Sequence, residues 1–204
     1  VNTCYLSNSG EVDGLELERH YRRLLRYMET HESPGFITEL YAPRNPERIT
    51  AEDRVFYTRR NALYLDTARQ TINLLPEEVR PYFIAPLLAE ASIHANTAGV
   101  FKGFYKDKQG VGKFGGSGGN ALSRILGDIC LQFPVFSRFD CRYSIHCRDA
   151  NELAEELPEM DVVYLDPPYN QHPYGSNYFM LNLLSSYKPV SYTHLRAHET
   201  VLDL

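Results

Sequence analysis

Hydrophobic residues recur at helical spacing in several stretches of the chain. Residues 14–28 form the clearest case, with these apolar side chains at helical spacing: Leu15, Tyr21, Leu24, Leu25 and Met28. This period predicts an amphipathic helix. Ser33, Pro34 and Gly35 follow and are typical of a break.

Three further stretches favour helix, namely residues 58–75, 81–96 and 121–133. In the first, apolar and charged faces alternate, and Asp66 and Arg69 belong to the charged set. Residues 81–96 are rich in alanine and leucine, which predicts a buried helix. Residues 100–119 between them are rich in glycine and lysine and predict a flexible loop.

The last third of the chain changes pattern. Residues 142–147 and 162–165 are short runs that predict strands, the second one buried. Residues 150–157 between them predict a helix that Asp149 caps, with Glu152 three residues later. A strand, helix and strand in this order predict a right-handed βαβ unit with parallel strands, and hence an α/β fold.

Charge is unevenly distributed over a chain whose net charge is −5. Residues 99–125 hold five basic side chains against Asp107 alone, whereas residues 149–161 hold six acids and no lysine or arginine. A basic segment on an acidic body suits a protein that holds a polyanion with one face. No apolar run reaches the length of a membrane span, and the four cysteines lack metal-binding spacing, so we expect neither a membrane partner nor a metal site.

The most informative chemistry is Asp166-Pro167-Pro168-Tyr169, directly after the predicted strand 162–165. The two prolines stop the strand, so that a carboxylate, a proline carbonyl and an aromatic ring are presented at its carboxyl end. The tetrapeptide resembles the motif of amino-methyltransferases. An exocyclic amine is a donor, so the Asp166 carboxylate and the Pro167 carbonyl suit it as acceptors, and Tyr169 suits stacking on a flipped base. The alternative is a proline turn with a surface tyrosine.

The resemblance extends over about residues 5–187. Its other elements are Arg60-Asn61-Ala62 with Asp66 and Arg69, residues 96–104, and Asn170, Tyr174 and Asn177-Tyr178. Together they resemble the D12-class adenine-specific DNA methyltransferases of bacterial modification systems. His172-Pro173 replaces the Arg-Gln that most such proteins carry before this tyrosine.

The resemblance implies a Rossmann-like S-adenosylmethionine-dependent methyltransferase fold, incomplete here and with a mainly helical insertion. We expect a partial methyltransferase domain at residues 1–188. Within it, residues 34–139 would include target recognition, and residues 140–188 would hold the catalytic βαβ unit and loop. Residues 189–204 would be a non-native tail. The chain begins at Val1 without a methionine, and we expect it to be an N-terminally truncated fragment that is inactive alone.

The same resemblance assigns roles to individual residues. Asp166, Pro167, Pro168 and Tyr169 would be catalytic. Asp149 and Ala150, with Asp166, would contact S-adenosylmethionine, although Asp149 could equally serve only as a helix cap. The glycines of residues 114–118 match the cofactor loop by letter, but no apolar strand precedes them, so we expect a solvated loop beside DNA phosphate.

Double-stranded DNA is the implied partner, with a restriction endonuclease as a possible cognate enzyme and the bacterial cytoplasm as the compartment. The residues expected at DNA carry amide, ammonium or phenol groups: Asn96, Lys102, Lys106, Lys113, Tyr169, Asn170 and Asn177. Phe101, Phe104 and Tyr105 could lie against sugar or base, or could belong to the core. Two other functions stay open, N4-cytosine methylation and a non-catalytic DNA-binding fragment.

Overall fold

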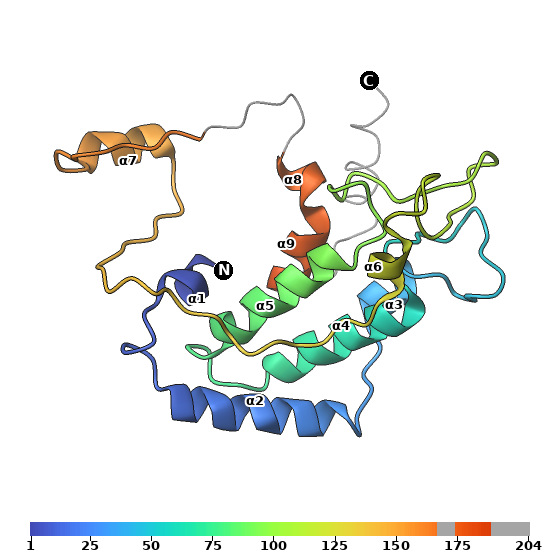
Figure 1. Cartoon of the computed structure of the whole chain (residues 1–204), viewed down its shortest axis with the longest axis horizontal. Coiled ribbons are helices and arrows are strands. Elements are labelled where there is room, and N and C mark those ends of the chain that lie inside the picture. The colour runs from blue at the N-terminus through green and yellow to red at the C-terminus, as the bar shows by residue number, and fades with distance from the viewer. Residues whose placement is uncertain (167–173, 189–204) are drawn as a thin grey trace.

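The described part of the chain is a body of helices with a long extended arm, residues 138–166 (Figure 1). A computed structural model describes residues 1–166 and 174–188. The helices in that part are α1 (Asn2–Leu6), α2 (Gly14–Met28), α3 (Phe36–Leu40), α4 (Arg59–Ile72), α5 (Arg80–Ile93), α6 (Leu122–Leu126), α7 (Ala150–Glu156), α8 (Tyr174–Asn177) and α9 (Phe179–Ser186). None of the helices in the described ranges is long and apolar enough to cross a membrane.

Helix α2 confirms the helix predicted for residues 14–28. Asp13 caps it, because its carboxylate accepts a hydrogen bond from the Glu16 amide at 3.0 Å. Leu17 and Leu24 are buried, whereas Leu15 is 77% exposed. The apolar stripe therefore begins at Leu17, and the charged face points to solvent.

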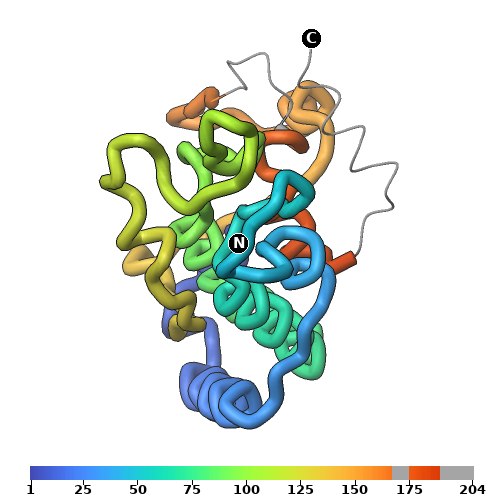
Figure 2. Tube along the Cα trace, turned by 90° about the vertical axis from the view of Figure 1, so that its right-hand side faces the viewer, coloured from blue at the N-terminus to red at the C-terminus, as the bar shows by residue number. Residues whose placement is uncertain are grey.

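Helices α4 and α5 form the centre of the body and lie beside each other (Figures 1 and 2). Thr58 begins α4 by accepting a hydrogen bond from the Asn61 amide at 3.1 Å. Pro81 lies in the first turn of α5, where its missing N–H costs no helical bond. Both helices begin and end within a few residues of the predicted positions.

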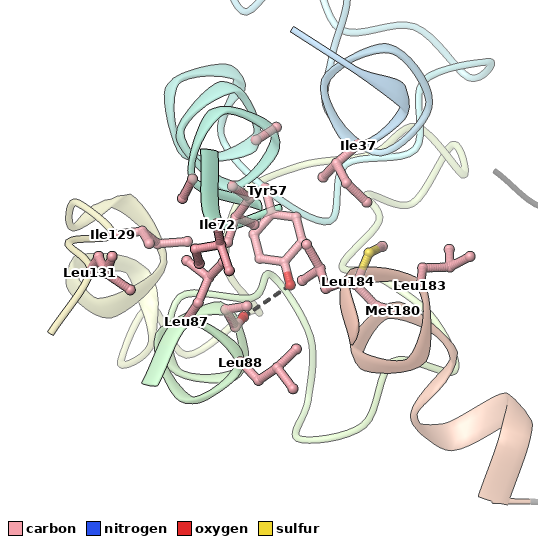
Figure 3. Close-up of a cluster of buried hydrophobic side chains, with 14 of the residues drawn as sticks. Ile37, Tyr57, Ile72, Leu87, Leu88, Ile129, Leu131, Met180, Leu183 and Leu184 are labelled. Carbon is pink, nitrogen blue, oxygen red and sulfur yellow. Dashed lines mark hydrogen bonds between the residues drawn. The ribbon is translucent and has the colours of Figure 1, made fainter. Parts of the chain in front are cut away.

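The hydrophobic core fills the space between α4, α5 and α9. Tyr57 lies at its centre, fully buried, and donates a hydrogen bond to the Ala91 carbonyl at 3.0 Å (Figure 3). Met180 and Leu184 of α9 pack into the same cluster. Burying an aliphatic side chain of this size stabilises the fold by about 1.5–3 kcal/mol, so α9 is part of the core. The sequence pattern did not predict this helix.

The helix predicted for residues 121–133 is wrong beyond α6. The chain is extended from Gly127 onward, because the Asn61 side chain holds it in that form. Its amide nitrogen donates to the Gly127 carbonyl at 2.8 Å, and its oxygen accepts from the Ile129 amide at 3.1 Å. An amide side chain that pairs with two backbone groups competes with helical bonding.

The two predicted strands are also wrong in this structure. Residues 142–147 and 162–165 have no strand pairing, and Val162 is 84% exposed. The pairs found in the described ranges are single bridges, Asn8 with Ser137 and Lys106 with Gly112. A strand is stable only when a neighbour satisfies its backbone groups, and no described segment pairs with these residues. Helix α7 does form between them, but no βαβ unit does, and the Rossmann-like α/β architecture is not confirmed.

Candidate nucleic-acid and methyl-transfer site

The loop that follows α5 is organised around the buried side chain of Asn96. Its amide nitrogen donates to the carbonyls of Val55 at 2.7 Å and Lys113 at 2.8 Å, and its oxygen accepts from the Gly115 amide at 2.9 Å. Asn96 is fully buried, so these internal bonds occupy the groups that were expected to face DNA. The residue instead closes the loop of residues 96–115.

A narrow hairpin turn, residues 105–113, projects from that loop. The Lys113 amide donates to the Tyr105 carbonyl at 2.9 Å, and the Asp107 amide donates to the Val111 carbonyl at 2.8 Å. The Asp107 carboxylate also accepts from the amides of Gln109 and Val111, each at 2.9 Å, and the bond from Gln109 makes an Asx turn. Gly110 has φ +82°, a conformation that favours glycine at this position.

Gly112 lets this hairpin turn lie close to the core. A Cβ atom there would stand 2.4 Å from a methyl carbon of Val55, so a larger residue would force the turn outward. Phe104 packs edge-on against Phe56 with ring centroids 5.1 Å apart. The base of the turn is thus attached to the core, and its tip is left in solvent.

The hairpin turn carries cationic side chains. Lys106 and Lys108 are exposed, and the Lys106 ammonium lies 5.1 Å from the Phe104 ring centre. Lys102 and Lys113 are half-buried at the base. Phe101, Phe104 and Tyr105 were expected either to contact DNA or to belong to the core. Phe101 is buried, whereas Phe104 and Tyr105 are half-buried. For Phe101 the core alternative is therefore the one observed.

The segment that follows the proline motif, residues 174–188, lies against the loop of residues 96–115, which we call the basic loop. The Phe101 amide donates to the Asn177 carbonyl, the last residue of α8, at 2.8 Å. Asn177 is 6% exposed, so its side chain is mostly covered. This bond brings together Phe101 and the end of α8, about 75 positions apart in the sequence. The sequence pattern had no signal for this contact.

The catalytic and cofactor candidates are only partly covered by the structure. Asp166 is exposed at the end of the extended arm. Pro167, Pro168, Tyr169 and Asn170 lie outside the described residues. Asp149 caps α7, and its carboxylate accepts from the Asn151 amide at 2.8 Å. Asp149 therefore serves as a helix cap, a role that is compatible with the expected cofactor contact.

The described residues do not place Asp149, Ala150 and Asp166 around a common pocket. Helix α7 has no buried residue, and it stands apart from the helical body in Figure 1. Within the described ranges, no group of three or more His, Cys, Asp or Glu residues is arranged to hold a metal ion.

Comparison with known proteins supports one family. The family model of the D12 class N6 adenine-specific DNA methyltransferases matches residues 24–192. The Type II methyltransferase M.CviAII of Paramecium bursaria Chlorella virus 1 is 32% identical over 163 residues, which is 77% of this chain and 42% of that protein. The Type II methyltransferase M.NlaIII of Neisseria lactamica is 28% identical over 144 residues, 68% of this chain and 39% of that protein.

A third relative extends the match further along the chain. The Type II methyltransferase M.FokI of Planomicrobium okeanokoites is 27% identical over 182 residues, 85% of this chain and 25% of that protein. The chain spans less than half the length of these relatives. No solved structure matches it.

Proposed function

Since the chain belongs to the D12 class N6 adenine-specific DNA methyltransferase family, we propose that it is part of an enzyme that methylates N6 of adenine in DNA. The family supports a methyltransferase fold and implies a methyl donor. We propose S-adenosylmethionine as that donor, and a Rossmann-like sheet as the framework of the complete enzyme. Double-stranded DNA is the proposed substrate. We propose that the enzyme acts in the bacterial cytoplasm, where that DNA lies.

The observation that carries this proposal is the Asp-Pro-Pro-Tyr sequence inside the family match, followed by a segment bonded to the basic loop. Asp166 would accept a hydrogen bond from the adenine amino group, and the Pro167 carbonyl would accept a second. Both bonds would favour the pyramidal form of the amine, in which the nitrogen lone pair is no longer conjugated with the ring. Tyr169 would stack on the adenine after it leaves the duplex.

The exposed lysines of the hairpin turn would hold the DNA backbone. Lys106 lies on the stem of the turn opposite Gly112, and Lys102 and Lys113 lie at its base, so the three could follow neighbouring phosphates. Asn170, which follows the Asp-Pro-Pro-Tyr sequence directly, is a further proposed DNA contact. Asn96 and Asn177 support this surface from inside. Asp149 and Ala150, at the start of α7, are the proposed contacts to S-adenosylmethionine.

The proposed setting is a modification system with a cognate restriction endonuclease. Two of the similar proteins bear the name modification methylase, one from Streptococcus sanguinis and one from Lactococcus lactis subsp. lactis. Mass spectrometry of methylated duplex would identify the product base. N4-methylcytosine in place of N6-methyladenine would refute the adenine assignment.

Replacing Asp166 tests the catalytic role in an enzyme that includes this chain. We expect Asp166→Ala to lower methyl transfer at least about a hundredfold, because an acceptor aimed at the reacting group is lost. DNA affinity should be retained, since an anionic carboxylate is not a side chain that holds phosphate. Transfer of labelled methyl groups and a gel-shift titration would measure the two quantities.

Asp161→Ala is the matched control, since Asp161 is an exposed acid on the same arm. It should leave methyl transfer within about twofold of the unmodified enzyme. Normal turnover by Asp166→Ala would contradict the proposed function.

A further inference from the structure

Helix α4 carries a buried carboxylate that binds two other parts of the chain. Asp66 is fully buried. It accepts hydrogen bonds from the amides of Gly35 at 2.9 Å, Ile37 at 3.2 Å and Thr38 at 2.7 Å, and from the Thr38 hydroxyl at 2.6 Å. A fifth bond comes from the Tyr187 hydroxyl at 2.7 Å. Four donors thus belong to the start of α3, and one belongs to the residue that ends α9.

One turn further along α4, Arg69 binds the end of α9 directly. Its guanidinium donates to the carbonyls of Leu184 at 2.7 Å and Ser185 at 2.8 Å. These are carbonyls of the last turn, which have no partner inside the helix. A cation beside them also interacts favourably with the helix dipole. Arg69 is 5% exposed, so the contact lies inside the molecule.

Tyr187 is held in an unusual backbone conformation between these two groups. Its φ is +46°, in the left-handed region that side chains other than glycine rarely adopt. Its ring lies 4.8 Å from the Phe36 ring and 5.7 Å from the Arg69 guanidinium carbon. Burial and the Asp66 carboxylate raise the pKa of the Tyr187 phenol, so the hydroxyl remains the donor.

Gly35 completes the arrangement, because a side chain there would collide with it. A Cβ atom at Gly35 would stand 2.5 Å from the Tyr187 hydroxyl and 2.8 Å from an Asp66 oxygen. We refer to Gly35, Asp66, Arg69 and Tyr187 as the α9 lock. Apolar packing alone would tolerate a small rotation or slide of α9. Directional polar contacts to a strained residue allow one position.

The α9 lock controls a segment that begins just after the proline motif. Residues 174–188 are bonded at one end to the basic loop, through Asn177 and Phe101, and at the other end to α4. Met180 and Leu184 lie between these ends and are buried, so the segment is fixed to the core along its length. A rigid helix transmits a displacement at its end to its beginning.

We infer that Asp66, Arg69 and Tyr187 are positioning residues that hold α9 and α8, the helices that follow the Asp-Pro-Pro-Tyr motif in the sequence, in place against the basic loop of residues 96–115. This inference rests on the proposed function. The three residues touch neither substrate nor cofactor. They act through α9 and α8 on the neighbouring motif, where misplacement by about 1 Å can cost up to about a hundredfold in rate.

Tyr187→Phe tests the inference by removing one oxygen atom. Asp66 keeps its four donors from α3, and the ring keeps its neighbours, so the fold should survive. We expect the single-turnover rate constant for methyl transfer to fall at least about fivefold. Affinity for DNA should change by less than about twofold. Loss of folded enzyme would lower the amplitude of the single turnover and leave the rate constant unchanged, so the two effects separate.

Tyr21→Phe is the matched control. Tyr21 is also half-buried, donates one hydrogen bond, to the Leu131 carbonyl at 2.8 Å, and packs on a phenylalanine, Phe133. It lies on α2, away from α9 in Figure 1. Loss of the Tyr21 hydroxyl should leave the single-turnover rate constant for methyl transfer unchanged. Arg69→Lys retains the charge but loses the paired contact, and should lower the rate constant further than Tyr187→Phe.

Amide hydrogen exchange of residues 174–186 provides a readout that needs no methyl transfer. Exchange there should accelerate in Tyr187→Phe and not in Tyr21→Phe. Unchanged exchange, or equal rate constants for the two variants, would overturn the inference. If the unmodified enzyme transfers no methyl group to adenine, the proposed function is refuted, whereas accelerated exchange would still establish the α9 lock.

Discussion

At the scale of single residues, buried polar side chains determine how the connections run. Asn61, Asp66 and Asn96 each bind backbone groups of another part of the chain. Among the described side chains, no buried nitrogen or oxygen lacks a hydrogen-bond partner. Leaving such a group unpaired costs about 1–3 kcal/mol. Each of these residues therefore favours one path of the backbone over others of similar hydrophobic burial.

Asp53 provides a pH test of this principle. It is 6% exposed and accepts from the amides of Arg44 and Thr50 and from the Thr50 hydroxyl. Burial acts to raise the pKa of Asp53, but these hydrogen bonds outweigh burial and lower it below its ordinary value of 3.8. A lowered pKa contributes stability above the unfolded value, and this contribution is lost as the pH falls through the folded value.

We therefore expect Asp53→Asn to destabilise the chain by about 1–3 kcal/mol near neutral pH. The difference from the unmodified chain should shrink below about pH 4, where the Asp53 carboxylate of the unfolded chain begins to protonate while the native one is still charged. Urea unfolding at several pH values would measure it. A difference that stays constant between pH 7 and pH 3 would show that the charge of Asp53 contributes nothing.

At the scale of elements, the helices were predictable where burial follows a helical period. The period of residues 14–28 and the apolar stretch 81–96 led to α2 and α5. The short helix α9 was missed, and the helix expected for residues 121–133 ended at Leu126. In that case the partner of Gly127 and Ile129 is Asn61, more than 60 residues away. Local pattern carries no information about such a partner.

The hairpin turn of residues 105–113 is the element from which DNA affinity should come. Replacing Lys106 and Lys108 with glutamine should weaken DNA binding and reduce the salt dependence of log K by about two, since each phosphate contact contributes about 0.9. Affinity measured between 50 and 200 mM salt would give that slope.

Arg23→Gln on α2 is the control for this measurement, as an exposed cation at the far side of the body in Figure 1. It should leave the slope unchanged. Equal slopes for the control and the double lysine variant would remove the hairpin turn from the DNA interface.

At the scale of the whole molecule, the family was predictable from the sequence, whereas the strand pairing was not. The motif at residues 166–169 indicated the family, because its chemistry is local. The predicted strands 142–147 and 162–165 did not pair, because pairing depends on neighbours that a local pattern cannot supply. Within the candidate site, no sequence signal indicated the contact of Asn177 with Phe101, since it joins the end of a helix to a loop through the backbone.

Limited proteolysis tests this architecture in the 204-residue chain. Arg138, Arg142 and Arg148 lie on the arm, whereas Arg69 is buried in the body. Trypsin should cut the arm first. The piece that contains α9 should nevertheless co-elute with the N-terminal piece on a sizing column, because Leu184 and Met180 are core residues. Early cuts within α4 or α5, or separate elution of the two pieces, would contradict the structure.

The arm also has a consequence for handling the chain. Val162, Val163, Tyr164 and Leu165 are each at least 65% exposed, and they form a β-prone run with unpaired backbone groups. A bare edge of this kind is a template on which other chains can add as strands. Copies of this polypeptide would thus pair with one another along the run, and self-association would rise with concentration.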